Sequence, residues 1–167
     1  DVCEGANIGM VKIGRRSNVQ AETPITLDAY AYDHTVPETR QYIETARVFV
    51  GTVHSLLNRP DLLRLKQFHT AIVDEASQLL EPHLVGILSE VGRFILIGDE
   101  KQLPAVITQA VERTRVVDQS LSDIGIRDLR TSLFERLLSA CQTNQWSSAY
   151  GMLEAQARMH QQIQAFP

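Results

Sequence analysis

The stretch AIVDEASQLLEPHLVGILSEVGRFILIGDEKQLPAV, residues 71–106, contains two apolar runs that each lead into acidic residues. The first run is followed by Asp74 and Glu75, and the second ends in Gly98 and Asp99. Short continuous apolar runs are typical of strands buried on both faces of a parallel sheet. We therefore expect two strands that bring acids to one edge of a sheet, the edge where α/β proteins bind ligands.

The acidic pair after the first run has two chemical interpretations. In ATPases that transfer phosphoryl groups, an acid at this place holds Mg²⁺, and a neighbouring group orients or deprotonates the attacking water. Asp74 is then the metal-side acid and Glu75 the water-side acid. In the alternative interpretation, the pair only caps the helix that follows.

The loop after the second run favours the first interpretation. DEASQ at residues 74–78, followed by GDEKQLPAV at residues 98–106, resembles motifs II and III of superfamily 1 helicases, in the branch that includes the nonsense-mediated-decay helicase and senataxin. The resemblance implies an α/β fold: a partial RecA-like P-loop NTPase domain with a mainly parallel sheet flanked by helices. It also implies that Asp74 assists Mg²⁺, that Glu75 activates water, and that Gln102 senses the γ-phosphate of ATP. Asp99 is expected to brace the loop.

The last residues of the chain resemble a further helicase motif. In MLEAQARMHQQIQAFP, residues 152–167, Arg158 matches an arginine that approaches the γ-phosphate from the second motor domain. A guanidinium that is always charged suits the charge that develops on transferring phosphoryl oxygens. The chain departs from the motif at Ala157, where the family has an aromatic residue, and at Gln161, where it has proline. Stacking of an aromatic ring on the nucleotide base is therefore not predicted.

Hydroxyl groups follow another expected strand, residues 47–51. By resemblance, Thr52 and Ser55 contact the backbone of single-stranded DNA or RNA, and such contacts position the strand without reading its sequence. A helix N-cap at Thr52 is an equally good interpretation, and one hydroxyl can serve both roles. Nearer the start, Arg15 and Arg16 occupy a turn that is either solvated or contacts phosphate.

Local patterns predict several other elements. Thr35 to Glu38 and Ser132 to Glu135 have the form of capping boxes and open two helices. Proline near the start of the segment after DEASQ predicts another helix. Alternating apolar residues predict strands in residues 7–14 and 21–34, and the polar residues 108–130 predict loops and short helical turns.

Composition limits the classes of function. The chain has 167 residues, of which 44% are hydrophobic and 22% charged, as expected for one soluble globular domain. Its net charge of −4 provides no global basic field for nucleic acid. Cys3 and Cys141 are far apart, which indicates reduced thiols and an intracellular location, cytoplasmic or nuclear. No run approaches the roughly 18 apolar residues of a membrane helix, so no membrane partner is expected.

The sequence contains no G-x-x-x-x-G-K-[ST] phosphate loop. We therefore expect residues 1–148 to be the later part of a first RecA-like domain, and residues 149–167 to be its last strand and the start of a linker or second domain. Such a piece of a longer protein should be inactive alone. The family's phosphate-loop strand lies beside the motif III strand, so we expect residues 149–153, or a second copy of the chain, to pair with residues 94–97. A strand at 94–97 that is paired on one side only and open to solvent would contradict this.

Three hypotheses about function follow. The first is ATP- and Mg²⁺-dependent movement of the intact protein along single-stranded DNA or RNA. The alternative is a helicase-like interaction module without ATPase activity. A third, an unrelated Mg²⁺-dependent phosphohydrolase, requires a complete cluster of carboxylates in this chain.

Overall fold

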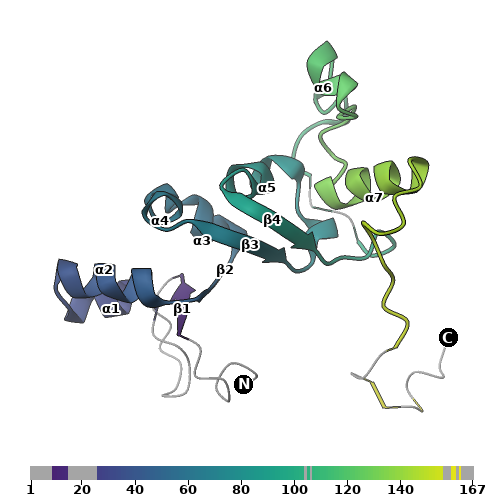
Figure 1. Cartoon of the computed structure of the whole chain (residues 1–167). Helices are drawn as coiled ribbons and strands as arrows, with labels where there is room; N and C mark the ends of the chain where they lie inside the picture. Colours follow the sequence, from purple (N-terminus) through teal and green to yellow (C-terminus); the bar gives the residue numbers. More distant parts are fainter. Residues whose placement is uncertain are drawn as a thin grey trace.

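The computed structural model describes residues 9–14, 26–103, 105, 107–155, 159–160 and 162 (Figure 1). Its strands and helices alternate along the chain, as in other α/β proteins. The strands are β1 (Met10–Ile13), β2 (Val48–Gly51), β3 (Phe68–Val73) and β4 (Val91–Leu96). The helices are α1 (Leu27–Asp33), α2 (Val36–Thr45), α3 (Val53–Leu57), α4 (Pro60–Leu65), α5 (Glu81–Leu88), α6 (Gln119–Asp123) and α7 (Leu133–Thr143), with 3₁₀ turns η2 (Ala76–Gln78) and η3 (Val111–Arg113).

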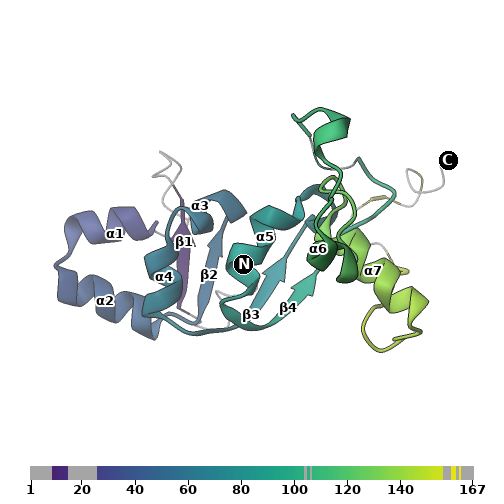
Figure 2. The same cartoon turned by 90° about the horizontal axis from the view of Figure 1, so that it is seen from above.

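The strands form two parallel pairs. β1 pairs with β2, with Val11 opposite Phe49, and β3 pairs with β4, with Ile72 opposite Ile95. Figure 2 shows the strands in chain order across the molecule, with α3, α4 and α5 over one face. Phe49 also contacts Phe68 edge to face at a ring-centroid distance of 5.0 Å, which joins the two pairs. The expected α/β fold with parallel strands and flanking helices is thus confirmed.

Two apolar cores fill the space between the strands and the helices. The core beside β1 and β2 consists of Val11, Ile13, Leu27, Ile43, Ala46 and Leu62. The core beside β3 and β4 consists of Leu84, Leu88 and Leu133, with Ala71, Val73 and Leu96 packed against it. Leu84 and Leu88 are four residues apart and therefore lie on the same face of α5. This second core supports the strands that end in the acidic residues.

The other face of β3 and β4 is open to solvent. The paired side chains of Ile72 and Ile95 are 66% and 50% exposed. Among the described residues, β4 pairs with β3 alone. The strand expected at residues 149–153 is absent because the turn after α7, with Gln145 at φ 57°, leads into an irregular segment away from β4 (Figure 1). Within the described part of the chain, residues 94–97 are thus paired on one side only and open to solvent, which contradicts the predicted pairing with residues 149–153. A single chain does not test pairing with a second copy, so that part stays a prediction, which sedimentation at several concentrations can test.

Capping residues set the boundaries of the helices. Capping boxes begin α2 at Thr35 and α7 at Ser132, as predicted. The expected strand in residues 21–34 is wrong where the structure describes it, because residues from Leu27 onward form α1. Thr26 is the N-cap of α1, and its hydroxyl accepts a hydrogen bond from the backbone N–H of Ala29 (3.3 Å). This cap makes a helix more stable than the extended form that the apolar alternation suggested.

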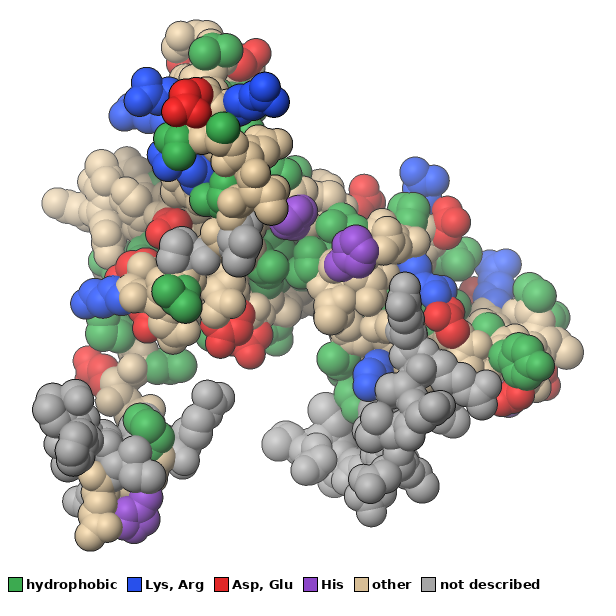
Figure 3. All heavy atoms as spheres, turned by 180° about the vertical axis from the view of Figure 1, so that it is seen from behind, with side chains coloured by type: hydrophobic (Ala, Val, Ile, Leu, Met, Phe, Trp, Pro, Cys, Tyr) green, Lys and Arg blue, Asp and Glu red, His purple; other side chains and the backbone are tan. Residues whose placement is uncertain are grey.

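Residues 107–130 form a lobe built of η3, α6 and the irregular segments between them. Figure 3 shows basic and acidic side chains mixed at the top of this lobe. The two short elements have three and five residues, which confirms the prediction of loops and short helical turns. Within the described ranges, no helix has both the length and the apolar character to cross a membrane.

Candidate functional site

Asp74 and Glu75 lie at the carboxyl end of β3, and both are exposed. Glu75 adopts a left-handed backbone conformation (φ 53°, ψ 36°), which non-glycine residues adopt rarely and which is frequent at functional sites. An oxygen of Asp74 accepts a hydrogen bond from the N–H of Glu75 (3.0 Å). The amide of Gln78 donates to Oε2 of Glu75 (3.0 Å). The turn therefore holds both carboxylates in place at the surface.

The acidic pair does not cap the helix that follows. The N-cap of α5 is Leu80, which makes no side-chain capping bond, and Glu75 makes none as N-cap of η2. The helix-capping interpretation of Asp74 and Glu75 is therefore wrong. The structure leaves their carboxylates available for another role.

The 3₁₀ turn η2 is attached to the end of β4. The N–H of Ala76 donates to the carbonyl of Ile97 (2.8 Å), and the N–H of Ile97 donates to the carbonyl of Val73 (2.8 Å). Ser77 is buried in this turn and its hydroxyl accepts a hydrogen bond from the N–H of Asp99 (3.3 Å). Ser77 was not predicted from the sequence, because its burial depends on β4. The one local indication of a role for Ser77 is its position in DEASQ, between Glu75 and Gln78.

The loop after β4 is organised by Asp99. Its Oδ1 accepts from the N–H of Lys101 (2.9 Å), and its Oδ2 accepts from the side-chain amide of Gln102 (3.3 Å). This confirms that Asp99 braces the loop. Gln102 itself is exposed, at the carboxyl end of the strand next to β3. The amide and the acidic pair thus lie at the same edge of the sheet.

Thr52 and Ser55 form a hydroxyl pair at the carboxyl end of β2. The Thr52 hydroxyl accepts from the N–H of Ser55 (3.2 Å) and donates to the Ser55 hydroxyl (2.9 Å). The N-cap role of Thr52 for α3 is therefore confirmed. The contact with nucleic acid that we expect for these two residues stays a prediction.

Asp74 is a described residue that could help to hold a magnesium ion. Mg²⁺ is usually held by one or two carboxylates together with phosphate oxygens and water, and the exposed Asp74 suits this role. Arg158, the expected second-domain arginine, lies outside the described residues, as do Arg15 and Arg16. Over the ranges that the structure describes, no three His, Cys, Asp or Glu side chains form a group that could hold a metal ion. The hypothesis of an unrelated phosphohydrolase required such a group and gains no support.

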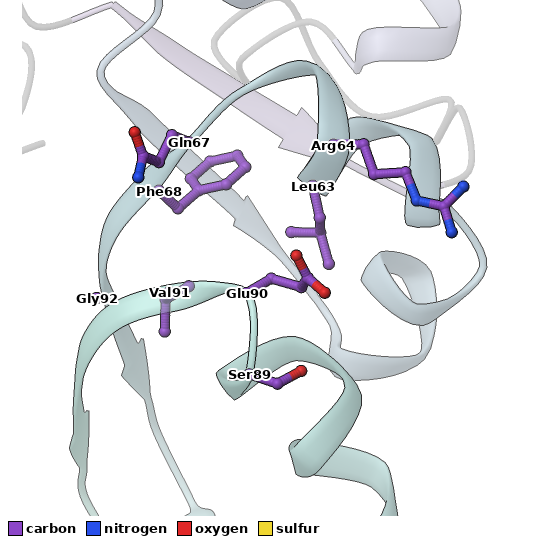
Figure 4. Close-up of a pocket in the computed structure, with 8 residues that line it drawn as sticks. All are labelled: Leu63, Arg64, Gln67, Phe68, Ser89, Glu90, Val91 and Gly92. Atoms are coloured by element: carbon purple, nitrogen blue, oxygen red, sulfur yellow. The ribbon is translucent and has the colours of Figure 1, made fainter.

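A surface pocket lies at the opposite end of the same strands (Figure 4). It is formed where β3 and β4 begin, far along both strands from the acidic pair. Its lining residues are Leu63, Arg64, Gln67, Phe68, Ser89, Glu90, Val91 and Gly92. Open sheets of parallel strands bind ligands at their carboxyl ends, so we do not assign the candidate site to this pocket.

Comparison with known sequences identifies the family. The sequence model described as "AAA domain" matches residues 12–110, more than half of the chain. The chain is 29% identical to the DNA replication ATP-dependent helicase/nuclease DNA2 of Gallus gallus, over 93% of this chain and 14% of that protein. It is 36% identical to the probable helicase MAGATAMA 3 of Arabidopsis thaliana, over 60% of this chain and 10% of that protein. It is 28% identical to the DNA polymerase alpha-associated DNA helicase A of Saccharomyces cerevisiae, over 77% of this chain and 18% of that protein.

The chain belongs to this AAA-domain family, which is a family of P-loop NTPase domains. The resemblance to superfamily 1 helicases, stated above for residues 74–78 and 98–106, is confirmed by these relatives. The chain spans less than a fifth of the length of each of the three. The activity of the longer protein that contains this chain is therefore proposed in the next subsection.

Proposed function

We propose that this chain is part of the motor of an ATP-dependent nucleic-acid helicase. One observation carries the proposal: the exposed Asp74, Glu75 and Gln102 follow two hydrogen-bonded parallel strands at the same edge of the sheet. This edge is where such sheets bind ligands. The relatives named above are helicases, which supports the same function.

Each residue has a separate role in the proposal. Asp74 holds Mg²⁺, and the ion when bound neutralises charge on the phosphates. Glu75 orients and deprotonates the attacking water, and Gln78 keeps the Glu75 carboxylate in position. Gln102 donates a hydrogen bond to the γ-phosphate, and Arg158 approaches the same group from the second motor domain. The chain alone should hydrolyse little or no ATP, because its sequence has no phosphate loop.

The nucleic-acid partner in the proposal is a single strand of DNA or RNA. Thr52 and Ser55 are suited to contact its phosphates, because their hydroxyls lie at the carboxyl end of β2. The net charge of −4 means that affinity depends on local contacts, or on other segments of the whole protein. Because two of the relatives are named for DNA replication or a DNA polymerase, we place the protein inside the cell, in the nucleus or cytoplasm. Residues 1–148 then belong to the first motor domain, and 149–167 lead toward the second.

The test is ATP hydrolysis by the full-length protein that contains this chain, with and without single-stranded DNA and RNA. Glu75→Gln should lower turnover by about two orders of magnitude or more while ATP binding survives, which is the scale of a positioned acid-base group. Glu90→Gln is a matched control, because Glu90 is an exposed carboxylate at the other end of the same strands. If a folded protein hydrolyses no ATP with either nucleic acid, the proposal is overturned in favour of an interaction module without ATPase activity.

A further inference from the structure

The turn η2 touches both loops of the proposed site. On one side, Gln78 donates to the carboxylate of Glu75 (3.0 Å). On the other side, the Ser77 hydroxyl accepts from the N–H of Asp99 (3.3 Å), and the Asp99 carboxylate accepts from the amide of Gln102 (3.3 Å). Three hydrogen bonds, together with the peptide bond between Ser77 and Gln78, therefore connect the carboxylate of Glu75 to the side-chain amide of Gln102.

The approach of the two loops is also fixed by close contact. A Cβ atom at Gly98 would lie 2.9 Å from the backbone nitrogen of Ser77 and 3.2 Å from its hydroxyl oxygen. Real Cβ atoms do not approach backbone so closely, so the absence of a side chain at Gly98 permits this contact. Ser77 is only 5% exposed, and the neighbouring Ala76 is bonded to Ile97 of the same segment. Ser77 thus has little room to move relative to the loop after β4.

We propose that Ser77 is a positioning residue for the hydrolysis of ATP. It fixes the backbone of Asp99, whose carboxylate orients the amide of Gln102 toward the γ-phosphate. Because Ser77 and Gln78 are adjacent in one 3₁₀ turn, the same element sets the positions of Gln102 and Glu75 relative to each other. This inference rests on the proposed function of Glu75 and Gln102.

The test compares Ser77→Ala, Gln102→Ala and the double variant in the full-length protein. Ser77→Ala removes the acceptor for Asp99 and leaves nearly the same volume. Loss of one ordinary hydrogen bond should lower kcat about fivefold, with little change in KM for ATP, because the bond acts when the phosphoryl group is transferred. The double variant should be no slower than Gln102→Ala, since Ser77 acts through Gln102. Ser122→Ala is the control, because the Ser122 hydroxyl lies in α6 and donates to the carbonyl of Asp118, the N-cap of that helix.

The outcomes separate this inference from the proposed function. If Gln102→Ala lowers kcat but Ser77→Ala does not, Ser77 is not a positioning residue and the inference is overturned alone. If the two losses multiply in the double variant, Ser77 has a structural role independent of Gln102, which overturns it as well. If the unmodified protein hydrolyses no ATP, the proposed function fails and this inference fails with it. Should Ser77→Ala not fold, Ser77→Cys provides the comparison, because its side chain is of similar size and its sulfur is a weak hydrogen-bond acceptor.

Discussion

Arg136 of α7 forms a two-pronged ion pair with Glu81 at the start of α5. Its Nε lies 2.8 Å from Oε2 of Glu81, and its Nη2 donates to Oε1 of the same carboxylate. Its Nη1 also donates to the carbonyl of Ile124 at the end of α6 (3.0 Å). The side chains of Arg136 and Glu81 are only 20% and 11% exposed. One guanidinium therefore joins α5, α7 and the lobe that contains α6.

Replacement of Arg136 should destabilise the fold strongly. Arg136→Met keeps much of the apolar stem but leaves the carboxylate of Glu81 largely buried without its partner. We expect the free energy of unfolding to fall by about 2–4 kcal/mol, which urea denaturation measures. Arg64→Met is the control, because its pair with Asp61 is 3.9 Å long and exposed and should contribute little. Equal midpoints for the two variants would show that the pair does not stabilise the fold.

Gly98→Ala should disturb the contact between η2 and the loop after β4. The added methyl group would lie 2.9 Å from the nitrogen of Ser77, and backbone atoms cannot rotate away as a side chain can. Overpacking of this kind should cost about 1–3 kcal/mol, seen as a lower melting temperature. Gly151→Ala is a matched control because no atom of the residues that the structure describes lies within 4 Å of its added Cβ. A melting temperature for Gly98→Ala equal to that of the control would contradict the close packing.

The pKa of Asp128 should be low in the folded protein. The side chain of Arg130 donates hydrogen bonds to both oxygens of the Asp128 carboxylate, and these bonds hold its pKa well below the usual range. Because the folded-state pKa is lowered, the stabilising contribution is complete above the unfolded pKa of about 3.9. It is lost as the pH falls from there through the folded-state pKa.

Titration of the Asp128 carboxyl group by NMR measures this effect directly. Arg130→Gln removes the charge and should raise the pKa of Asp128 toward its ordinary value. Arg64→Gln, on α4, should leave the Asp128 titration as it is. An Asp128 pKa that does not change in Arg130→Gln would mean that Arg130 is not the cause.

The sequence predicts those elements of the fold that are determined by residues close together in the sequence. Capping boxes at Thr35 and Ser132 place two helix starts, because the bonds involved span only three residues. The apolar runs around DEASQ correctly predict that β3 and β4 exist and pair in parallel. The prediction that both faces of these strands are buried is wrong, because α5 and α7 cover one face and Ile72 and Ile95 are exposed on the other. The positions of Asp74 and Gln102 at the edge of the sheet follow from those strands.

Errors occur where distant or competing contacts decide the structure. Leu27 and Tyr30 are three residues apart, which fits a helix as well as an irregular strand, and the cap by Thr26 selects the helix. Residues 149–153 are far from β4 in the sequence, so no local pattern could show whether they pair with it, and the structure has no strand there. The bond from Asp99 to Ser77 joins residues 22 positions apart, so sequence spacing alone did not reveal it.

Ser55 offers the sharpest test of the proposed nucleic-acid contact. Thr52 cannot provide it, because Thr52→Ala also removes the N-cap of α3, a loss that typically costs about 1 kcal/mol. Ser55→Ala keeps the cap bond, which uses the backbone N–H of Ser55, and removes the exposed hydrogen bond that the Thr52 hydroxyl donates to the Ser55 hydroxyl. The melting temperature should therefore fall less in Ser55→Ala than in Thr52→Ala.

In the full-length protein, Ser55→Ala should weaken binding to single-stranded DNA or RNA about fivefold at a fixed salt concentration, the effect of one hydrogen bond. The loss should be equal for unrelated base sequences, because phosphate contacts carry no sequence information. Fluorescence anisotropy with two unrelated oligonucleotides measures both expectations. Ser89→Ala is the control, since Ser89 is exposed at the other end of the sheet. Unchanged affinity would leave Thr52 and Ser55 with helix capping as their role, and the strand-binding surface would then lie elsewhere on the protein.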